Sequence, residues 1–141
     1  MAMPATPTGL LEAAIYVDDL DDAEAFYVGV VGLRTVTRQN PRHIFFACGE
    51  TVVLAFNAEQ TRIPAAEGKL PVPTHGAVGP GHICFSVPGE DLDGWVEHLS
   101  TKGIGIEEDF HWPNGARSVY VRDPAGNSVE FAEPKLWGLG T

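Results

Sequence analysis

The sequence contains few cations and no long apolar run. Lysine and arginine total 9 against 19 aspartate and glutamate residues, which gives a formal net charge of −10. A surface this acidic repels phosphate backbones and anionic lipid head groups, so we expect no nucleic-acid or membrane partner. No stretch approaches the roughly 20 apolar residues that a membrane-spanning helix needs. The chain is therefore expected to act in water, away from both kinds of polyanion.

Cysteine is also scarce, and the N-terminus carries no targeting signal. Cys48 and Cys84 are the two cysteines, and both lie in apolar, strand-like runs. This usage favours buried thiols in a reducing compartment over a disulfide framework. The first nine residues, MAMPATPTG, lack the basic region and apolar core of a signal peptide. We expect a cytoplasmic protein in which residues 1–9 form a flexible lead.

The two halves of the chain show the same order of predicted elements. The first half reads as strand, helix and three strands, at residues 10–17, 18–32, 34–39, 43–48 and 51–57. The second half repeats this order at residues 81–87, 91–102, 104–112, 116–122 and 127–132. The sequence thus predicts an α+β fold of two tandem βαβββ modules. We expect an eight-stranded, cup-shaped mixed sheet with its helices outside.

Segments of irregular composition separate and follow the two modules. Residues 58–79 contain Pro64, Pro71 and Pro73, which disfavour regular structure and predict a connecting loop. Its length is typical of a binding loop or lid. The modules accordingly span residues 10–57 and 80–133, and residues 134–141 form a C-terminal tail.

Strand alternation places three candidate metal ligands on one inner surface. Side chains along a strand point to opposite faces in turn, and several strands here have one apolar face and one small or polar face. Glu12, His82 and Glu130 all lie on the second kind of face. The internal repeat aligns Glu12 with His82, and Glu130 with Val53, which we place on the inner face. Pseudo-twofold symmetry then brings the three polar side chains together.

One imidazole and two carboxylates suit a divalent metal ion. Mn²⁺, Fe²⁺, Co²⁺, Ni²⁺ and Zn²⁺ all accept such ligands, and the pattern does not choose among them. Each residue also has a structural alternative. His82 could be an ordinary core or surface residue, Glu12 could be exposed, and Glu130 could pair with Arg122. Only their joint placement predicts the metal site.

Other polar and aromatic side chains are candidates for substrate contact. Each also has a structural alternative, such as packing, a strand end or a surface ion pair. These candidates are Tyr16, Asn57, His75, His111, Trp112, Arg117 and Tyr120. No candidate general base stands out among them.

Three segments resemble the vicinal oxygen chelate superfamily of glyoxalases, bleomycin-resistance proteins and dioxygenases. They read LEAAIYVDDLDDAEAFYVGVVGL, GHICFSV and YVRDPAGNSVEF. The resemblance implies metal ligands in the first and last strands of each module, at Glu12, Val53, His82 and Glu130. The first of these positions is commonly His or Gln in the family. Because Val53 cannot ligate, the implied site has three protein ligands.

The resemblance also implies a chemistry and an assembly. Metal-dependent members bind a small substrate through two neighbouring oxygens, which predicts a lyase, isomerase or transferase that acts on an oxygenated metabolite. An Fe²⁺ extradiol-type dioxygenase and a non-catalytic, drug-binding protein are the alternatives. Family members commonly bury their sheet edges in a homodimer. Whether the cup forms within one chain or between two chains is left open.

Overall fold

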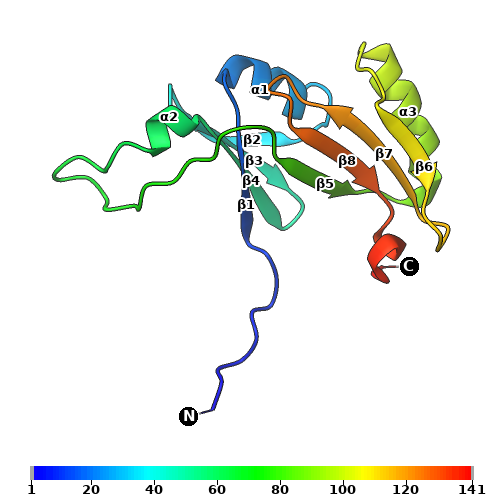
Figure 1. Cartoon of the computed structure of the whole chain (residues 1–141), viewed down its shortest axis with the longest axis horizontal. Helices are drawn as coiled ribbons and strands as arrows, with labels where there is room; N and C mark the ends of the chain where they lie inside the picture. The colour runs from blue at the N-terminus through cyan, green and yellow to red at the C-terminus, as the bar shows by residue number, and fades with distance from the viewer. Residues whose placement is uncertain (1, 141) are drawn as a thin grey trace.

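Two βαβββ modules follow one another along the chain in the computed structural model, which describes residues 2–140 (Figure 1). The first contains β1 (Glu12–Tyr16), α1 (Leu20–Tyr27), β2 (Arg34–Gln39), β3 (His43–Cys48) and β4 (Thr51–Phe56). The second contains β5 (His82–Ser86), α3 (Leu92–Thr101), β6 (Glu108–His111), β7 (Arg117–Arg122) and β8 (Ser128–Ala132). The tandem α+β architecture is confirmed. No helix in this described part is long and apolar enough to cross a membrane.

Three short helical elements complete the chain. The segment predicted as a connecting loop begins with a helix, α2 (Ala58–Thr61), before it extends away from the first sheet. Single 3₁₀ turns precede α3 and follow β8, at Gly89–Asp91 and Pro134–Trp137.

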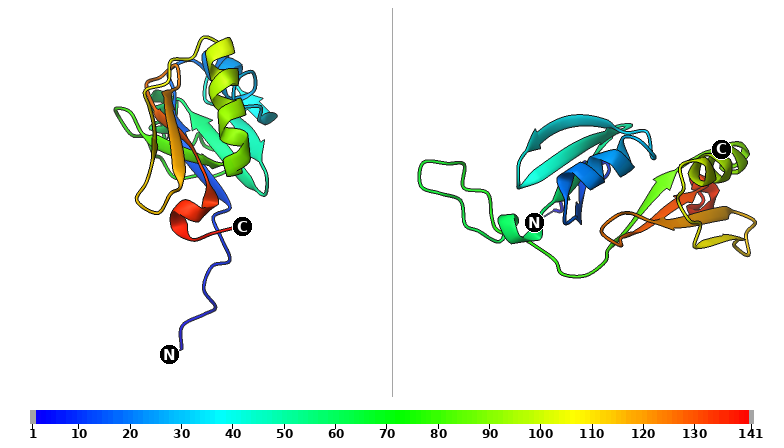
Figure 2. Two further views of the ribbon diagram at one scale, coloured as in Figure 1. Left: turned by 90° about the vertical axis from the view of Figure 1, so that its right-hand side faces the viewer. Right: turned by 90° about the horizontal axis from the view of Figure 1, so that it is seen from above.

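The eight strands form two separate four-stranded sheets. Their orders are β1-β4-β3-β2 and β5-β8-β7-β6. In each module the first strand is parallel to the last and the remaining pairs are antiparallel. Among residues 2–140 no strand pair joins the two sheets. The structure therefore has two four-stranded sheets in place of the expected continuous eight-stranded sheet (Figure 2).

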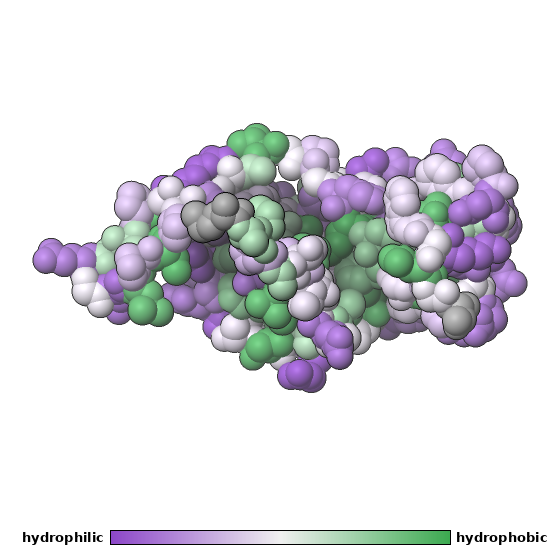
Figure 3. All heavy atoms as spheres, turned by 90° about the horizontal axis from the view of Figure 1, so that it is seen from below, coloured by the Kyte–Doolittle hydropathy of each residue, from purple (hydrophilic) through white to green (hydrophobic). Residues whose placement is uncertain are grey.

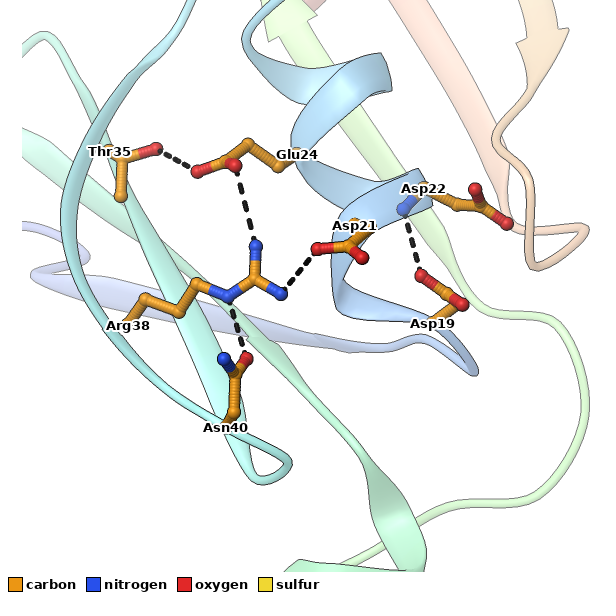
Figure 4. Close-up of polar contacts among 7 residues, drawn as sticks. All are labelled: Asp19, Asp21, Asp22, Glu24, Thr35, Arg38 and Asn40. Atoms are coloured by element: carbon orange, nitrogen blue, oxygen red, sulfur yellow. Dashed lines mark hydrogen bonds and ion pairs between the residues drawn. The ribbon is translucent and has the colours of Figure 1, made fainter.

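Helix α1 begins where an aspartate can cap it and buries one stripe of side chains. The Oδ1 atom of Asp19 accepts a hydrogen bond from the backbone N–H of Asp22 at 3.0 Å, which satisfies a free donor of the first turn (Figure 4). Helical spacing then buries Leu20, Ala23, Phe26 and Tyr27. Beyond the helix, Gly32 adopts the left-handed conformation expected of it, with φ at 90°.

One apolar core joins the helix-covered faces of both sheets. Phe26, Tyr27 and Phe46 of the first module belong to the same cluster as Phe85 and Phe131 of the second. The Tyr27 and Phe85 ring centroids are 6.4 Å apart. Because both covered faces contribute to this core, the two uncovered faces remain accessible.

A buried polar network fixes the two modules against each other. The hydroxyl of Tyr27 donates to Oδ2 of Asp123 at 2.7 Å, and the side-chain amide of Asn127 donates to the same carboxylate. That amide also donates to the backbone carbonyl of Tyr16 at 2.9 Å. Burial, together with the nearby Asp123, holds the pKa of Tyr27 far above its usual value. The hydroxyl therefore stays a donor at neutral pH.

An ion-pair network ties the acidic start of α1 to β2 (Figure 4). The Arg38 guanidinium donates to Asp21 at 2.6 Å and to Glu24 at 3.4 Å. Its Nε atom donates to the side-chain oxygen of Asn40 at 2.7 Å, and Thr35 donates to Glu24 at 3.1 Å. These acidic residues thus serve a structural role in the first module.

We predict that Tyr27→Phe lowers the free energy of unfolding by about 1–3 kcal/mol, because it leaves a buried carboxylate without one of its donors. Urea denaturation of the variant and the parent protein measures this difference. Tyr16→Phe is the matched control, since its hydroxyl bonds to the exposed side chain of His75. Equal losses in the two variants would contradict a special role for the buried bond.

Candidate metal and substrate site

The uncovered face of the second sheet gathers the predicted polar residues. We call this surface the second open face, and it is defined by His82, Cys84, Ser118, Tyr120, Ser128 and Glu130. Strand pairing places Cys84 beside Glu130, and Glu130 beside Tyr120. Their neighbours Val119, Val129 and Phe131 point the other way into the core. The expected alternation is therefore confirmed in this module.

His82 and Glu130 form the centre of the second open face. The His82 Nε2 atom lies 3.2 Å from Oε1 of Glu130. The Glu130 side chain is only 6% exposed, whereas that of His82 is 50% exposed. A nearly buried carboxylate thus lies next to a half-exposed imidazole, with an imidazole nitrogen and a carboxylate oxygen facing each other.

Three further side chains orient this pair. Ser128 Oγ lies 3.0 Å from Nδ1 of His82, on the ring nitrogen away from Glu130. Ser118 donates from Oγ to Oε2 of Glu130 at 2.6 Å and accepts from the indole N–H of Trp112 at 2.7 Å. Hydrogen bonds of this kind hold metal-ligating side chains in one orientation.

Tyr120 and Cys84 flank the pair and remain protonated at neutral pH. Burial and the nearby Glu130 raise the pKa of Tyr120 to about 12, so its hydroxyl is available as a donor. Burial of the thiol and the same carboxylate raise the pKa of Cys84 to about 12, which makes it unreactive. As residues, however, Cys84 is exposed and Cys48 is half-buried, so the expectation that both cysteines are buried was wrong.

Glu12 does not join His82 and Glu130 within one chain. It is exposed at the start of β1, on the uncovered face of the first sheet. Within residues 2–140 no three His, Cys, Asp or Glu side chains are placed to hold one metal ion. One chain therefore supplies two of the three predicted ligands at a single place.

Strand pairing corrects the residue equivalent to Glu130 in the first module. Glu12 pairs with Val52, and His82 pairs with Ser128, so the position two residues later is Leu54 in β4 and Glu130 in β8. Val53 instead points into the core. The predicted alignment of Glu130 with Val53 was therefore wrong by one residue, and the β3–β4 and β7–β8 turns differ in length. Leu54 is equally unable to ligate.

The candidates from the first module lie at the other end of its open face. The Tyr16 hydroxyl is 2.8 Å from Nδ1 of His75, whose ring lies against the ring of Phe56 with centroids 4.6 Å apart. Asn57 caps helix α2, and its side-chain oxygen accepts from the backbone N–H of Glu59 at 3.0 Å. The structure thus brings Tyr16 and His75 together and gives Asn57 a local structural role.

Arg117 and His111 oppose each other on the helix-covered side of β7 and β6. The Arg117 guanidinium donates to Asp109 at 2.8 and 2.9 Å and to Asp93 of α3 at 2.6 Å. These carboxylates raise the pKa of Arg117, and the arginine lowers that of Asp109. Of the second-module candidates, Trp112 and Tyr120 alone contact the second open face, and Arg117 pairs elsewhere.

Comparison with models of protein families identifies the family of this chain. The model of the Glyoxalase/Bleomycin resistance protein/Dioxygenase superfamily covers residues 9–131. The chain belongs to this superfamily. All three predicted ligands and all of both modules except Ala132, the last residue of β8, fall inside the matched range, so the resemblance noted from the three sequence segments is confirmed.

Two similar proteins are both lactoylglutathione lyases by name. A lactoylglutathione lyase of Haemophilus influenzae is 30% identical, with 93% of this chain and 98% of the relative covered. The crystal structure of a lactoylglutathione lyase from Agrobacterium tumefaciens is 44% identical, with a TM-score of 0.91 over 96% of this chain and 100% of that chain. A virulence protein of Salmonella typhimurium is 30% identical, with 83% and 78% covered. These comparisons support glyoxalase-superfamily function.

We predict that Arg117→Ala lowers the free energy of unfolding by about 1 kcal/mol, because its partners are partly screened by solvent. Asp109 has a folded-state pKa below its ordinary value of 3.8. Its contribution is therefore complete above that ordinary value and disappears as the pH falls through the folded-state pKa. Chemical denaturation over a pH series measures this dependence.

The matched control for Arg117→Ala is Arg122→Ala, which removes an ion pair with Glu107 in which both side chains are about half exposed. We expect a smaller loss there. A pH-independent effect of Arg117→Ala would contradict the Asp109 pairing as its cause.

Proposed function

We propose that the protein is a divalent-metal-dependent lyase, isomerase or transferase that chelates a small oxygenated metabolite through two neighbouring oxygens. The observation that carries the proposal is the buried Glu130 carboxylate with the His82 imidazole 3.2 Å away on an open face. An imidazole nitrogen and a carboxylate oxygen are ligands that Mn²⁺, Fe²⁺, Co²⁺, Ni²⁺ and Zn²⁺ all accept. The names of the lactoylglutathione lyase relatives favour the lyase class over a dioxygenase or a non-catalytic binder.

The third ligand is Glu12 of a second copy of the chain in a homodimer. Within one chain Glu12 lies on a different sheet, whereas twofold symmetry can bring the first module of one copy over the second module of the other. Leu10 and Leu11, immediately before Glu12, are 73% and 76% exposed, as expected of a segment that a partner covers. Two equivalent sites per dimer follow from this arrangement.

The side chains around the site have distinct roles. A divalent ion bound there supplies Lewis-acid stabilisation of negative charge on a substrate oxygen. Ser118 and Ser128 hold Glu130 and His82 in their ligating orientations, and Tyr120 offers a hydroxyl donor to the bound substrate. Leu54, at the position equivalent to Glu130, supplies no carboxylate for proton transfer. Tyr120 is our candidate proton donor on the second open face.

We predict stoichiometric divalent metal in protein purified without chelator, and little or none in His82→Ala and Glu130→Gln. Inductively coupled plasma analysis of the metals measures both, with circular dichroism to verify folding. Lys102→Ala, on an exposed residue after α3, is the control. Full metal content in the folded His82→Ala variant would sink the proposed site.

Complementation between two inactive variants tests the shared arrangement. We predict that Glu12→Ala and His82→Ala each lose metal, and that mixing and refolding them together restores part of it. In the mixed dimer one site collects both substitutions, while the other keeps Glu12 from one chain and His82 from its partner. A site built within one chain would regain nothing, because every chain carries one defect.

We predict that Ser118→Ala weakens metal binding by about 10- to 100-fold, because Glu130 loses the hydroxyl that orients it. Competition with a fluorescent chelator measures the affinity. Ser100→Ala, on the exposed side of α3, provides the matched control. Unchanged affinity in Ser118→Ala would show that the Glu130 contact is only structural.

A further inference from the structure

A groove lies between the two modules on their helix-covered side. One wall is the segment that follows helix α1, and the other is the start of helix α3 with the 3₁₀ turn before it. Its volume is about 480 Å³, and small-molecule sites in proteins have volumes of about 300–1,000 Å³. We call this cavity the back groove, and the residues that give it its character are Glu90, Asp91, Gly94, Trp95 and His98.

Trp95 forms the aromatic wall of the back groove and is held in place on two sides. One face of its indole stacks on the buried ring of Phe131, with centroids 4.6 Å apart and an interplanar angle of 20°. The His98 ring meets the indole edge-on, with centroids 5.5 Å apart. Trp95 is only half-buried, so part of the indole is left for a ligand in the groove. Indole attracts cations more strongly than the other aromatic side chains do.

His98 connects the two walls of the back groove. Its Nε2 atom lies 2.7 Å from the backbone carbonyl oxygen of Val30, beyond the end of α1. Because a carbonyl only accepts hydrogen bonds, this ring nitrogen donates, and in the neutral imidazole Nδ1 is then an acceptor. The bond ties α3 to the segment after α1, so the groove has walls of fixed separation.

The other polar groups of the back groove are acceptors of negative character. Glu90 and Asp91 are exposed, and among residues 2–140 neither of them takes part in an ion pair. Asp91 precedes α3, yet its side chain makes no capping hydrogen bond there. Helix α1 has no basic residue in its last turn, so its own side chains do not compensate the negative end of its dipole.

No fixed positive charge opposes these groups. Among the described residues that line the back groove there is no lysine or arginine. Two carboxylates, the carbonyl end of a helix and an indole therefore surround the same space. This combination is complementary to a cation that also has an apolar surface.

Gly94 keeps one wall of the back groove free of a side chain. It lies in the first turn of α3, where glycine disfavours the helix relative to alanine. A Cβ atom added there would meet no atom within 4 Å, so packing within the described chain does not require glycine. The missing side chain instead leaves the groove wider beside Trp95.

We propose that the back groove binds a small organic ammonium ion with an apolar or aromatic body. The ammonium group lies against Glu90, Asp91 and the carbonyl end of α1, and the body lies on Trp95. An inorganic cation would leave the indole unused, and a neutral ligand would leave both carboxylates without a partner. The site goes beyond the proposed function, because it shares no residue with the second open face or with Glu12.

Titration with phenethylammonium, followed by nuclear magnetic resonance, tests this proposal. Isotope-labelled protein reports the indole N–H of Trp95, which the Trp95→Phe variant assigns. Phenethyl alcohol is the matched neutral probe, because it keeps the aromatic body and replaces the ammonium group by a hydroxyl. We expect the amine to bind about tenfold more tightly than the alcohol, which corresponds to one charge-assisted hydrogen bond. Equal affinity for the two probes would overturn the proposal.

Variants of the groove separate a built site from general attraction to an acidic surface. Gly94→Lys places a tethered ammonium group in the groove and should abolish phenethylammonium binding, whereas Gly94→Ala should retain it. Glu90→Gln and Asp91→Asn should each weaken amine binding about fivefold, the value of one solvent-screened charge contact, and leave alcohol binding unchanged.

The matched control is Glu97→Gln, on an exposed residue of α3 outside the groove, which should keep the parent affinity. Circular dichroism verifies that each variant is folded. Parent affinity in folded Gly94→Lys, or a loss in Glu97→Gln equal to that in Asp91→Asn, would show non-specific binding and overturn the proposal.

Discussion

The buried bond between Tyr27 and Asp123 determines where the chemistry of this protein can occur. It joins the covered face of one module to the closing turn of the other, and Asn127 extends it to the backbone of β1. Since both covered faces are used in one core, the two open faces point away from that core and remain available. The hollow between the two halves is seen in Figure 3, where apolar side chains line its floor. A ligand held on one face therefore needs a second surface to enclose it.

Much of the architecture could be predicted because it depends on local periodicity. Alternation in β5 and β8 placed His82 and Glu130 on the same face, and the structure confirms it. Helical spacing likewise predicted a helix at residues 18–32, within which α1 lies. These features are set by neighbours in sequence, so a pattern of two or of three and four residues contains the information.

What the sequence could not supply depends on register and on contacts between distant segments. Val53 and Leu54 are both apolar, so only strand pairing shows which of them faces outward. Arg117 looked like a substrate contact because its partner on α3, Asp93, lies far away in sequence. Ser118 was missed for the related reason that a small hydroxyl within a β-strand sequence gives no sign of a functional contact. The Trp112 indole and the Glu130 carboxylate on either side of it become neighbours only when β6, β7 and β8 pair.

The two modules have the same strand topology but different side chains on their open faces. At equivalent places on their open faces, Glu12 matches His82, Leu54 matches Glu130, and Tyr16 matches Ser86. One face thus has the polar pair suited to a metal, and the other has an apolar and aromatic surface suited to recognition. Within a single chain the two open faces cannot cover each other, because the covered faces of both sheets pack together in one core. In the proposed homodimer, twofold symmetry removes this conflict, because the open face of the first sheet in each copy then covers His82 and Glu130 of the other copy.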